Sequence, residues 1–334
     1  MEAIAKLIRQ HETFLITTHV FPDGDGLGAE MALHGYLRKV GKRSVVWNAS
    51  PTPEKFQLVD PRNEIHVFQD GEKLPQVDAV FVMDTSSWKM LGPLQGPIAS
   101  LERNGTPVVF VDHHVPEIDR PERHLIDEQY GSTGELVYDF LRFLRADVDA
   151  EIALAIYVSI VTDTSSFRFK RTTARSHLIA AELLQKGVSP EAVYQYIYAR
   201  DSFAKIRLFG YVIEGIQATP DERVAWLTIP KSIRQYYKAT IEDTESFVNQ
   251  LTLMEHVEIG MLFREDDDGR VKLSLRGRGE VPVLGIAKKF GGGGHRHAAG
   301  AKLEMSLAEA VRQVTAEAKR FLDEFHPVTR KSTA

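Results

Sequence analysis

The segment that decides the fold of this protein is Thr18-His19-Val20-Phe21-Pro22-Asp23-Gly24-Asp25-Gly26-Leu27-Gly28. It joins an apolar run at residues 14–18, which is typical of a short buried strand, to a helical pattern at residues 27–40. One imidazole and two carboxylates therefore lie in a predicted loop. We expect the glycines at 24 and 26 to let the backbone turn both carboxylates towards one point. Because like charges are costly to pack together, the loop predicts a bound cation.

Three other segments place similar side chains at the ends of apolar runs. They are the run 79–83 followed by Asp84, the run 108–111 followed by Asp112-His113-His114, and the helical run 152–161 followed by Thr162-Asp163. Carboxylate oxygens mixed with imidazole, without thiolates, suit Mn²⁺, Mg²⁺ or Fe²⁺ better than a structural zinc ion. Two such ions held close together would make a phosphoester hydrolase.

Each segment also has a simpler interpretation when it is taken alone. An aspartate after a strand is usually a helix cap or a turn former, and a His-His pair more often lies on the surface. The glycines of the first segment miss the G-x-G-x-x-G spacing of a dinucleotide loop, and its two aspartates would repel a pyrophosphate. Four such segments at the ends of strands and helices in one domain are hard to explain without a metal.

The first half of the chain predicts an α/β fold. Short β-rich runs alternate with helical patterns, which is typical of a mostly parallel sheet flanked by helices. Such sheets bind ligands at the carboxyl ends of their strands. The chain then becomes helical, and Ser132-Thr133-Gly134-Glu135 fits a capping box at the start of the first of these helices. The predicted helices lie at residues 133–144, 152–161, 174–186, 190–200 and 202–215.

A second, smaller α/β unit is predicted from about residue 223. Its expected elements are strands at 224–229 and 257–263, a turn at 266–269, a partner strand at 270–275 and a final helix at 306–325. The two helices before it have no strand between them and are interpreted as a connector. We therefore divide the chain into a metal domain at 1–186, a helical connector at 187–218, a substrate-binding domain at 219–326 and a tail at 327–334.

Composition limits the classes of function. The 334 residues suffice for about two domains, and a hydrophobic content of 43% is ordinary for a globular protein. The absence of cysteine excludes a disulfide scaffold, a thiolate metal site and a cysteine nucleophile. A net charge of −5 argues against coating long duplex nucleic acid. No apolar run is long enough for a membrane span and the amino terminus lacks a signal peptide, so we expect a cytoplasmic protein without a membrane partner.

The segment 270–302 also predicts ligand binding. It carries eight Lys and Arg residues against one acidic residue, a local excess of seven positive charges. Arginine forks and the exposed backbone N–H groups of a glycine run both bind phosphate oxygens. The simpler interpretations are a flexible loop for the glycines and a solvated face for the charges. The candidate residues are Arg276, Arg278, Gly292, Gly293, Gly294 and His295.

The motifs of the first half, in their order, resemble those of the DHH phosphoesterases. This family includes RecJ-like nucleases, family II pyrophosphatases, exopolyphosphatases and nanoRNase/pAp phosphatases. The resemblance implies two Mn²⁺ ions per active site, with Mg²⁺ or another divalent ion as the alternative. It implies that one ion is held by His19, Asp23 and Asp84. The other ion would be held by Asp25, Asp84, His113 and Asp163, so that Asp84 bridges the two ions.

The resemblance also implies the catalytic residues. His114 would face the scissile phosphate, and Asp112 would orient the ligand histidine. Together with Asp84 these form the predicted catalytic set, and the implied mechanism is metal-assisted in-line hydrolysis.

The segment 272–301 resembles the DHH-associated type 1 domain. Its Arg276-Gly277-Arg278 stands where R-S-R is common, and its Gly-Gly-Gly-His loop precedes Ala-Ala-Gly. The resemblance implies that the two arginines, Gly292, Gly293, Gly294 and His295 bind the nucleotide portion distal to the scissile bond. It also implies that this domain closes over a cleft against the metal domain.

Among the family's members, a two-domain chain without an OB-type module or membrane spans most resembles the nanoRNase/pAp phosphatases. This implies hydrolysis of RNA of two to about five nucleotides to mononucleotides, and of 3′-phosphoadenosine 5′-phosphate (pAp) to AMP. Linear pApA is a further candidate substrate, and a homodimer is the implied assembly. Two alternatives stay open: a phosphatase restricted to small nucleotides such as pAp, and a non-catalytic nucleotide- or RNA-binding regulator.

Overall fold

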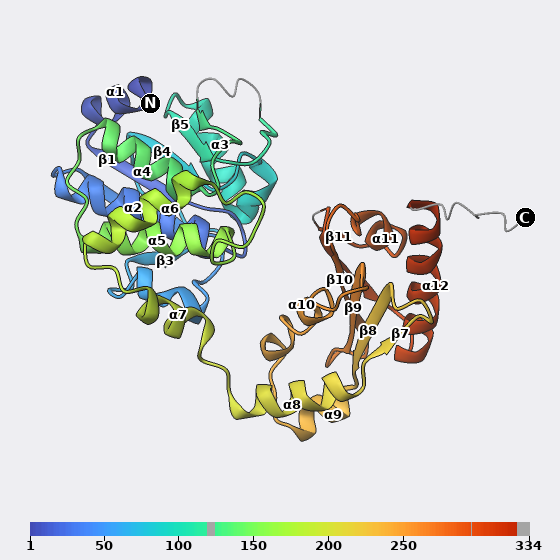
Figure 1. The fold of residues 1–334 in the computed structure, drawn as a ribbon. Helices are drawn as coiled ribbons and strands as arrows, with labels where there is room; N and C mark the ends of the chain where they lie inside the picture. The colour runs from blue at the N-terminus through green and yellow to red at the C-terminus, as the bar shows by residue number, and fades with distance from the viewer. Residues whose placement is uncertain (119–123, 295, 326–334) are drawn as a thin grey trace, which may run out of the picture. The chain divides into compact units, whose positions relative to one another are not determined.

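The computed structural model describes residues 1–118, 124–294 and 296–325, which form two compact units (Figure 1). Unit 1 is Met1–Arg200 and unit 2 is Asp201–Ala334. The predicted tail at 327–334 lies outside the described residues. Among the helices of the described ranges, none has both the length and the apolar character needed to cross a membrane.

Unit 1 is built on a six-stranded sheet in the order β3-β2-β1-β4-β5-β6, and all its strand pairs are parallel. The strands are β1 (Thr13–Thr17), β2 (Arg43–Asn48), β3 (Ile65–Val67), β4 (Ala79–Met83), β5 (Val108–Asp112) and β6 (Leu125–Ile126). This confirms the predicted parallel α/β domain. The chain order along the sheet reverses where β1 lies beside β4, which is where such sheets bind ligands.

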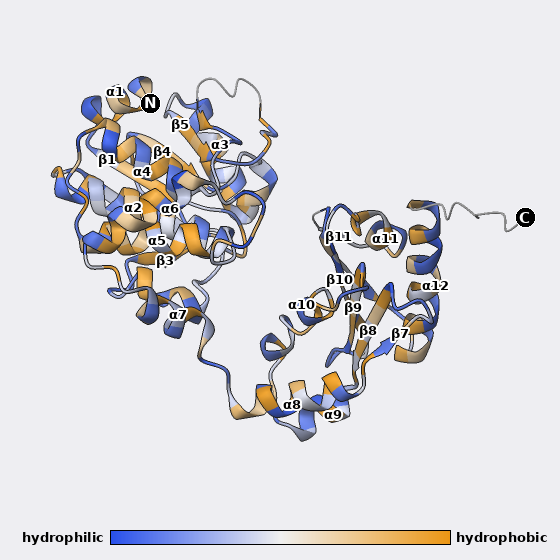
Figure 2. Cartoon of the chain, viewed as in Figure 1, coloured by the Kyte–Doolittle hydropathy of each residue, from blue (hydrophilic) through white to orange (hydrophobic). Residues whose placement is uncertain are grey.

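Seven α-helices and two 3₁₀ helices of the described residues accompany this sheet. They are α1 (Glu2–Gln10), α2 (Gly24–Lys39), α3 (Gln95–Arg103), α4 (Thr133–Phe143), α5 (Ala150–Asp163), α6 (Ala174–Gln185), α7 (Pro190–Tyr198), η1 (Glu54–Val59) and η2 (Trp88–Leu94). In Figure 2 the central strands are largely coloured as hydrophobic, as expected for a sheet covered on both faces.

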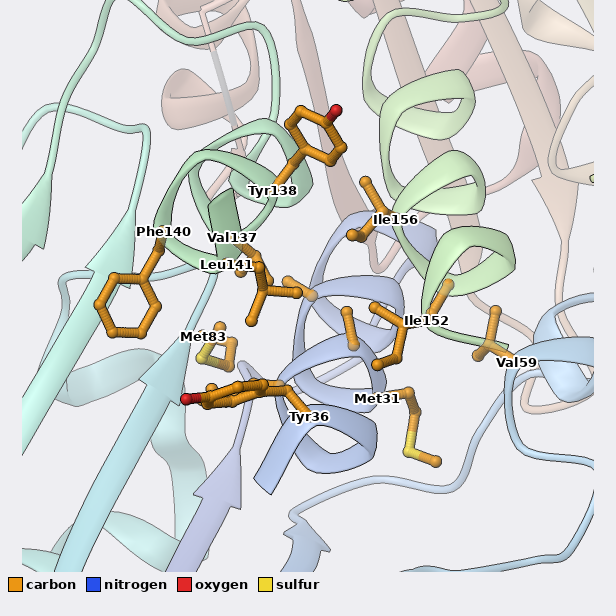
Figure 3. Close-up of a cluster of buried hydrophobic side chains, with 14 of the residues drawn as sticks. Met31, Tyr36, Val59, Met83, Val137, Tyr138, Phe140, Leu141, Ile152 and Ile156 are labelled. Atoms are coloured by element: carbon orange, nitrogen blue, oxygen red, sulfur yellow. The ribbon is translucent and has the colours of Figure 1, made fainter. Parts of the chain in front are cut away.

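Two hydrophobic clusters cover the two faces of this sheet. On one face the helices α2, α4 and α5 pack against β1, β4 and β5, and Figure 3 shows Met31, Leu141, Ile152 and Ile156 gathered in this cluster. On the other face η2 and α3 pack against the same strands. Truncation of one such buried side chain to alanine lowers the free energy of unfolding by about 2–5 kcal/mol. This packing therefore holds in place the edge of the sheet that carries the candidate site.

The helix α2 begins three residues earlier than its pattern predicts, because Asp23 is its N-cap. Asp23 Oδ1 accepts hydrogen bonds from the backbone N–H of Asp25 at 2.9 Å and of Gly26 at 3.2 Å. The two glycines are therefore helical and do not supply the backbone freedom expected of them, although Asp23 and Asp25 both reach the cluster of predicted ligands. They lie in the first helical turn where space is tight: a Cβ at Gly24 would lie 2.2 Å from Thr162 Oγ1.

Only half of the predicted capping box forms at the start of α4. Ser132 Oγ accepts a hydrogen bond from the backbone N–H of Glu135 at 3.2 Å, as predicted. The Glu135 carboxylate instead accepts a hydrogen bond from the backbone N–H of Gly131 at 3.3 Å. This hydrogen bond holds the loop that precedes α4 against the first turn of the helix.

Unit 2 contains a mixed sheet in the order β11-β12-β10-β9-β8-β7. Its elements are α8 (Phe203–Glu214), β7 (Gln217–Ala218), β8 (Val224–Ile229), α9 (Lys231–Tyr236), η4 (Glu242–Thr244), α10 (Val248–Leu251), β9 (Ile259–Glu265), β10 (Val271–Gly277), α11 (Leu284–Lys289), β11 (Gly293–Gly294), β12 (Ala298–Leu303) and α12 (Leu307–Phe325). The antiparallel β9–β10 pair confirms the predicted hairpin. β8 and β9 are parallel, and β12 is a strand that the sequence pattern did not predict.

Each of the two predicted connector helices packs within one unit. α7 places Val193 and Ile197 in the core of unit 1. α8 places Leu208 and Val212 in a cluster of unit 2 that covers one face of its sheet, while α11 and α12 cover the other face. The boundaries at residues 186 and 218 stay a prediction.

Candidate metal centre

The predicted metal ligands converge at the carboxyl end of the unit 1 sheet. Because neighbouring parallel strands end at the same edge, the residues that follow β1, β4 and β5 are brought together. The first turn of α2 and the last residue of α5 reach the same place. The six predicted ligands form two groups, within each of which the ligand atoms lie within 4.8 Å of one another: His19, Asp23 and Asp84, and Asp25, His113 and Asp163. Asp84, His113 and His114 form a third group by the same distance.

The first group is centred on the imidazole of His19. Its Nε2 lies 3.5 Å from Asp84 Oδ2 and 3.9 Å from Asp23 Oδ1. Its Nδ1 lies 2.8 Å from the carbonyl oxygen of Val20, which fixes the proton on Nδ1 and leaves the Nε2 lone pair facing the carboxylates. Asp23 thus serves both as a helix cap and as a member of the cluster.

The second group is centred on His113. Its Nε2 lies 3.3 Å from Asp163 Oδ2, 3.4 Å from Asp25 Oδ2 and 3.7 Å from Asp84 Oδ1. Its Nδ1 lies 3.1 Å from the carbonyl oxygen of Tyr130, so Nε2 is again the unprotonated nitrogen. Burial lowers the pKa of His113 to about 4, which keeps the ring neutral, as a metal ligand must be.

Asp84 connects the two groups, because its two oxygens face different histidines. It directly follows β4 and has a φ of +58°, a conformation that non-glycine residues rarely adopt and that concentrates at functional sites. Thr133 Oγ1 donates a hydrogen bond to Asp84 Oδ1 at 2.8 Å. Burial and the neighbouring charges of Asp23 and Asp112 raise the pKa of Asp84 well above its usual range.

Asp25 is held by the amino-terminal end of α4. Its carboxylate accepts hydrogen bonds from the backbone N–H of Thr133 at 2.9 Å and of Gly134 at 3.1 Å, and from the Ser159 hydroxyl. Burial, followed by the charge of Asp84, raises the pKa of Asp25 well above its usual range. The helix terminus offsets only part of this repulsion.

The donor set fits divalent cations. Buried carboxylates face one another and resist being ionised together, and cations between them would remove that penalty. Neutral imidazoles and hard carboxylate oxygens, without thiolates, are ligands for Mn²⁺, Mg²⁺ and Fe²⁺.

Asp112 contacts a different histidine from the one that the resemblance implies. Its Oδ1 accepts hydrogen bonds from His114 Nδ1 at 2.8 Å and from the His114 backbone N–H at 3.1 Å. The Nδ1 of His113 is oriented by a backbone carbonyl, so the expected role of Asp112 is wrong. Although burial alone would lower it, the bond to Asp112 raises the pKa of His114 above its ordinary value. His114 therefore keeps a free Nε2 on a partly exposed ring.

Several residues of the centre were not predicted. The backbone of Thr133 and Gly134 and the hydroxyl of Ser159 support Asp25, although the Ser-Thr-Gly sequence indicated only a helix start. Arg171 Nη1 donates to Asp163 Oδ2 at 2.6 Å and lies 3.3 Å from His113 Nε2. No motif marks Arg171, because it reaches the centre only through the loop that follows α5.

The predicted phosphate-binding residues of unit 2 lie on β10, β11 and the adjoining loop. Arg276 Nε donates to Asn249 Oδ1 at 2.9 Å, and Arg278 Nη1 donates to the carbonyl oxygen of Met254 at 2.7 Å. Both guanidiniums are thus anchored within unit 2, and each has further N–H donors. His295 lies outside the described residues.

The second half of the glycine run forms the short edge strand β11, so its interpretation as a flexible loop is wrong there. Gly293 and Gly294 pair with β12. A Cβ at Gly292 would lie 2.1 Å from the carbonyl oxygen of Gly300, which explains that glycine by close packing. A Cβ at Gly293 would meet no atom of the described residues within 4 Å, so among those residues its backbone has open space beside it.

The positive charge of the segment 270–302 is reduced by acidic residues outside it. Arg270 pairs with Asp268 at 2.6 Å, and Lys289 pairs with Glu317 at 2.6 Å. The local excess counted from the sequence therefore overstates the charge available to a ligand.

Comparison with known proteins shows the family of this chain. The model of the DHH family, N-terminal domain, matches residues 13–160, and the model of the DHHA1 domain matches residues 231–324. One curated relative is 30% identical over almost the whole chain. The chain therefore belongs to the DHH family, which confirms the resemblance of its motifs.

That relative is the bifunctional oligoribonuclease and PAP phosphatase NrnA of Thermus thermophilus; the match covers 94% of this chain and 92% of that protein. The protein of the same name from Bacillus subtilis is 24% identical, covering 90% and 92%. The crystal structure of an exopolyphosphatase-related protein from Bacteroides fragilis has a TM-score of 0.90 at 25% identity, covering 98% and 96%. RecJ of Thermus thermophilus in complex with Mn²⁺ shares the fold, with a TM-score of 0.55 at 15% identity, covering 96% and 54%.

Proposed function

We propose that this chain hydrolyses RNA of two to about five nucleotides to mononucleotides and pAp to AMP, with pApA as a further substrate. The observation that carries the proposal is Asp84, whose two oxygens face two groups of metal ligands. A pair of cations at one carboxylate is the arrangement of two-metal phosphoesterases. The names of the NrnA relatives support these substrate classes.

The first group would hold one divalent ion and the second group, with Asp84, would hold the other; we propose Mn²⁺ for both. Bound there, the ions would supply an activated water at neutral pH and neutralise phosphate oxygens. The fit of neutral imidazoles and mutually repelling buried carboxylates supports this assignment. Arg171 adds a guanidinium beside Asp163, and we assign it to an oxygen of the substrate phosphate.

We assign two tasks to His114. It stabilises the negative charge on a phosphate oxygen, and it supplies a proton to the reaction. Asp112 fixes its Nδ1 proton, and the raised pKa favours an imidazolium whose Nε2–H can donate to a phosphate oxygen. Asp112 is therefore a positioning residue, and His114 is the residue that contacts the substrate.

Unit 2 is proposed to capture the distal nucleotide. Arg276, Arg278 and the open backbone beside Gly293 offer N–H donors to a phosphate, and His295 adds an imidazole by the family resemblance. A short set of donors suits a substrate with few phosphates. A homodimer and a cytoplasmic location belong to the same proposal, and sedimentation of the purified chain tests the first.

The substrates can be ranked in one experiment. The kcat/KM values for a dinucleotide, a pentanucleotide, pAp and pApA are measured with the same Mn²⁺ concentration. We expect turnover of all four, with the dinucleotide and pAp above the pentanucleotide. Turnover of pAp alone would favour the restricted phosphatase, and binding without turnover of any substrate would favour the regulator.

A further inference from the structure

Phe21 is an exposed aromatic side chain inside the metal-binding loop. It lies two residues from His19 and two from Asp23, and it is 84% exposed, whereas Pro22 is buried. Because two residues span at most about 7 Å of chain, its backbone lies close to both predicted ligands. A single exposed apolar residue needs no explanation by itself, but this one lies in the loop that carries two predicted metal ligands.

The backbone holds Phe21 in a conformation that bulky residues rarely adopt, with a φ of +55°. Its N–H donates to Ser50 Oγ at 3.2 Å, and the preceding N–H of Val20 donates to the carbonyl oxygen of Met90 at 2.7 Å. On its other side, Asp23 caps α2. The loop is thus anchored on both sides of the ring, and a strained conformation of this kind is typical of a ligand-binding position.

We propose that Phe21 is the stacking platform for the nucleobase next to the scissile phosphate. The inference rests on the proposed function and names the chemistry by which this loop selects nucleotides over other phosphoesters. A phenyl ring offers a π-face to every base, so it captures RNA of any sequence. One short loop then supplies both the ligands for the cations and the contact for the base.

The test uses two substrates that differ only in the base: pAp and its abasic analogue, ribose 3,5-bisphosphate. For Phe21→Ala we expect kcat/KM for pAp to fall about 5- to 150-fold, the range given by base–aromatic stacking. The kcat/KM for the abasic analogue should stay unchanged. Phe21→Trp should retain the wild-type value for pAp, whereas Phe21→Leu, which is apolar but has no π-face, should lose as much as Phe21→Ala.

Phe143→Ala is the matched control. Phe143 is also exposed, at 46%, and lies at the end of α4 opposite to the one that holds Asp25. We expect it to leave both kcat/KM values unchanged, and we expect Phe21→Ala to keep the wild-type Mn²⁺ content and thermal midpoint. Equal losses on pAp and on the abasic analogue, or no loss on either, would overturn the stacking role.

A binding measurement separates this inference from the proposed function. Phe21→Trp adds a tryptophan fluorophore near the metal centre. The fluorescence of this variant in excess of the wild-type fluorescence should be quenched by pAp but not by ribose 3,5-bisphosphate. If the wild type hydrolyses neither a dinucleotide nor pAp while this quenching depends on the base, the proposed function fails and the stacking role stands. If hydrolysis proceeds and quenching ignores the base, the stacking role alone fails.

Discussion

The metal centre of unit 1 and the arginine–glycine segment of unit 2 are built in opposite ways. In unit 1 the central side chains are buried, and they lie at strand ends or are held by the start of α4. Asp25, for example, accepts three hydrogen bonds. In unit 2, Arg278 is exposed and Arg276 is half-buried, and each donates hydrogen bonds to residues of its own unit. Bond-breaking chemistry needs groups that are fixed before the substrate arrives, whereas capture of a flexible nucleotide tolerates adjustable side chains.

The largest effect should come from Asp84→Asn. The substitution removes a charge that faces both ligand groups, so kcat for dinucleotide cleavage should fall by more than the 10- to 100-fold that is typical of losing an outer partner of a metal site. Bound metal should fall as well. Asp70→Asn, at an exposed position in the same unit, is the control. Near-native turnover in Asp84→Asn would break the assignment of Asp84 as the shared ligand.

Asp112→Asn should have the next largest effect, because it removes the acceptor that orients His114. We expect kcat to fall about 10- to 100-fold while the metal content stays unchanged. Since Asp112 raises the pKa of His114, its loss lets the imidazole lose its proton at lower pH. The deficit in kcat should therefore grow as pH rises. A deficit that is constant with pH, or a loss of metal, would contradict this role.

Arg276→Ala and Arg278→Ala sharpen the comparison from the side of unit 2. Each should raise KM for the dinucleotide about 10- to 100-fold, the effect of one or two hydrogen bonds to a charged group, and leave kcat and metal content unchanged. Arg320→Ala on α12, where the arginine pairs with Glu317, is the control. A loss in kcat as large as that of Asp112→Asn would contradict the proposal that unit 2 captures substrate while unit 1 carries the chemistry.

Glu30→Gln should have the smallest effect, on stability. Burial raises the pKa of Glu30 from 4.5 to about 8, and among the described residues one of its oxygens has a hydrogen-bond partner, Asn48 at 2.7 Å, while the other has none. A carboxyl with a raised folded-state pKa contributes its full stability below about pH 4.5 and loses it as pH rises towards 8. The thermal midpoint of Glu30→Gln should therefore decline less between pH 5.5 and 8.5 than that of wild type. Glu102→Gln, which is exposed, should follow the wild type.

Much of unit 1 can be predicted from the sequence, because its hydrophobic pattern and its ligand motifs indicate the same edge of one sheet. Apolar runs that end on Asp84 and on Asp112 place those residues at one edge of a parallel sheet, and the sheet confirms this. The spacing of residues does not encode tertiary contacts. The partner of Asp112 depends on the turn after β5, and Arg171 reaches Asp163 only through the path of a loop.

Unit 2 is harder to predict from its sequence for the same physical reason. Its glycines indicate freedom of the backbone, yet Gly292 is explained by the close approach of Gly300 on a strand that no pattern marks. Its counted charge is partly neutralised by acidic residues from outside the segment. Both effects come from neighbours in space that the local sequence does not contain.

The most direct test of the account is a titration of Mn²⁺ into chelator-treated protein, with bound metal and cleavage of a 5′-labelled dinucleotide measured in the same samples. We expect no cleavage without metal and full recovery as two ions bind per chain. Cleavage that is indifferent to the chelator, or full activity with a single bound ion, would contradict the central claim that Asp84 joins two metal sites.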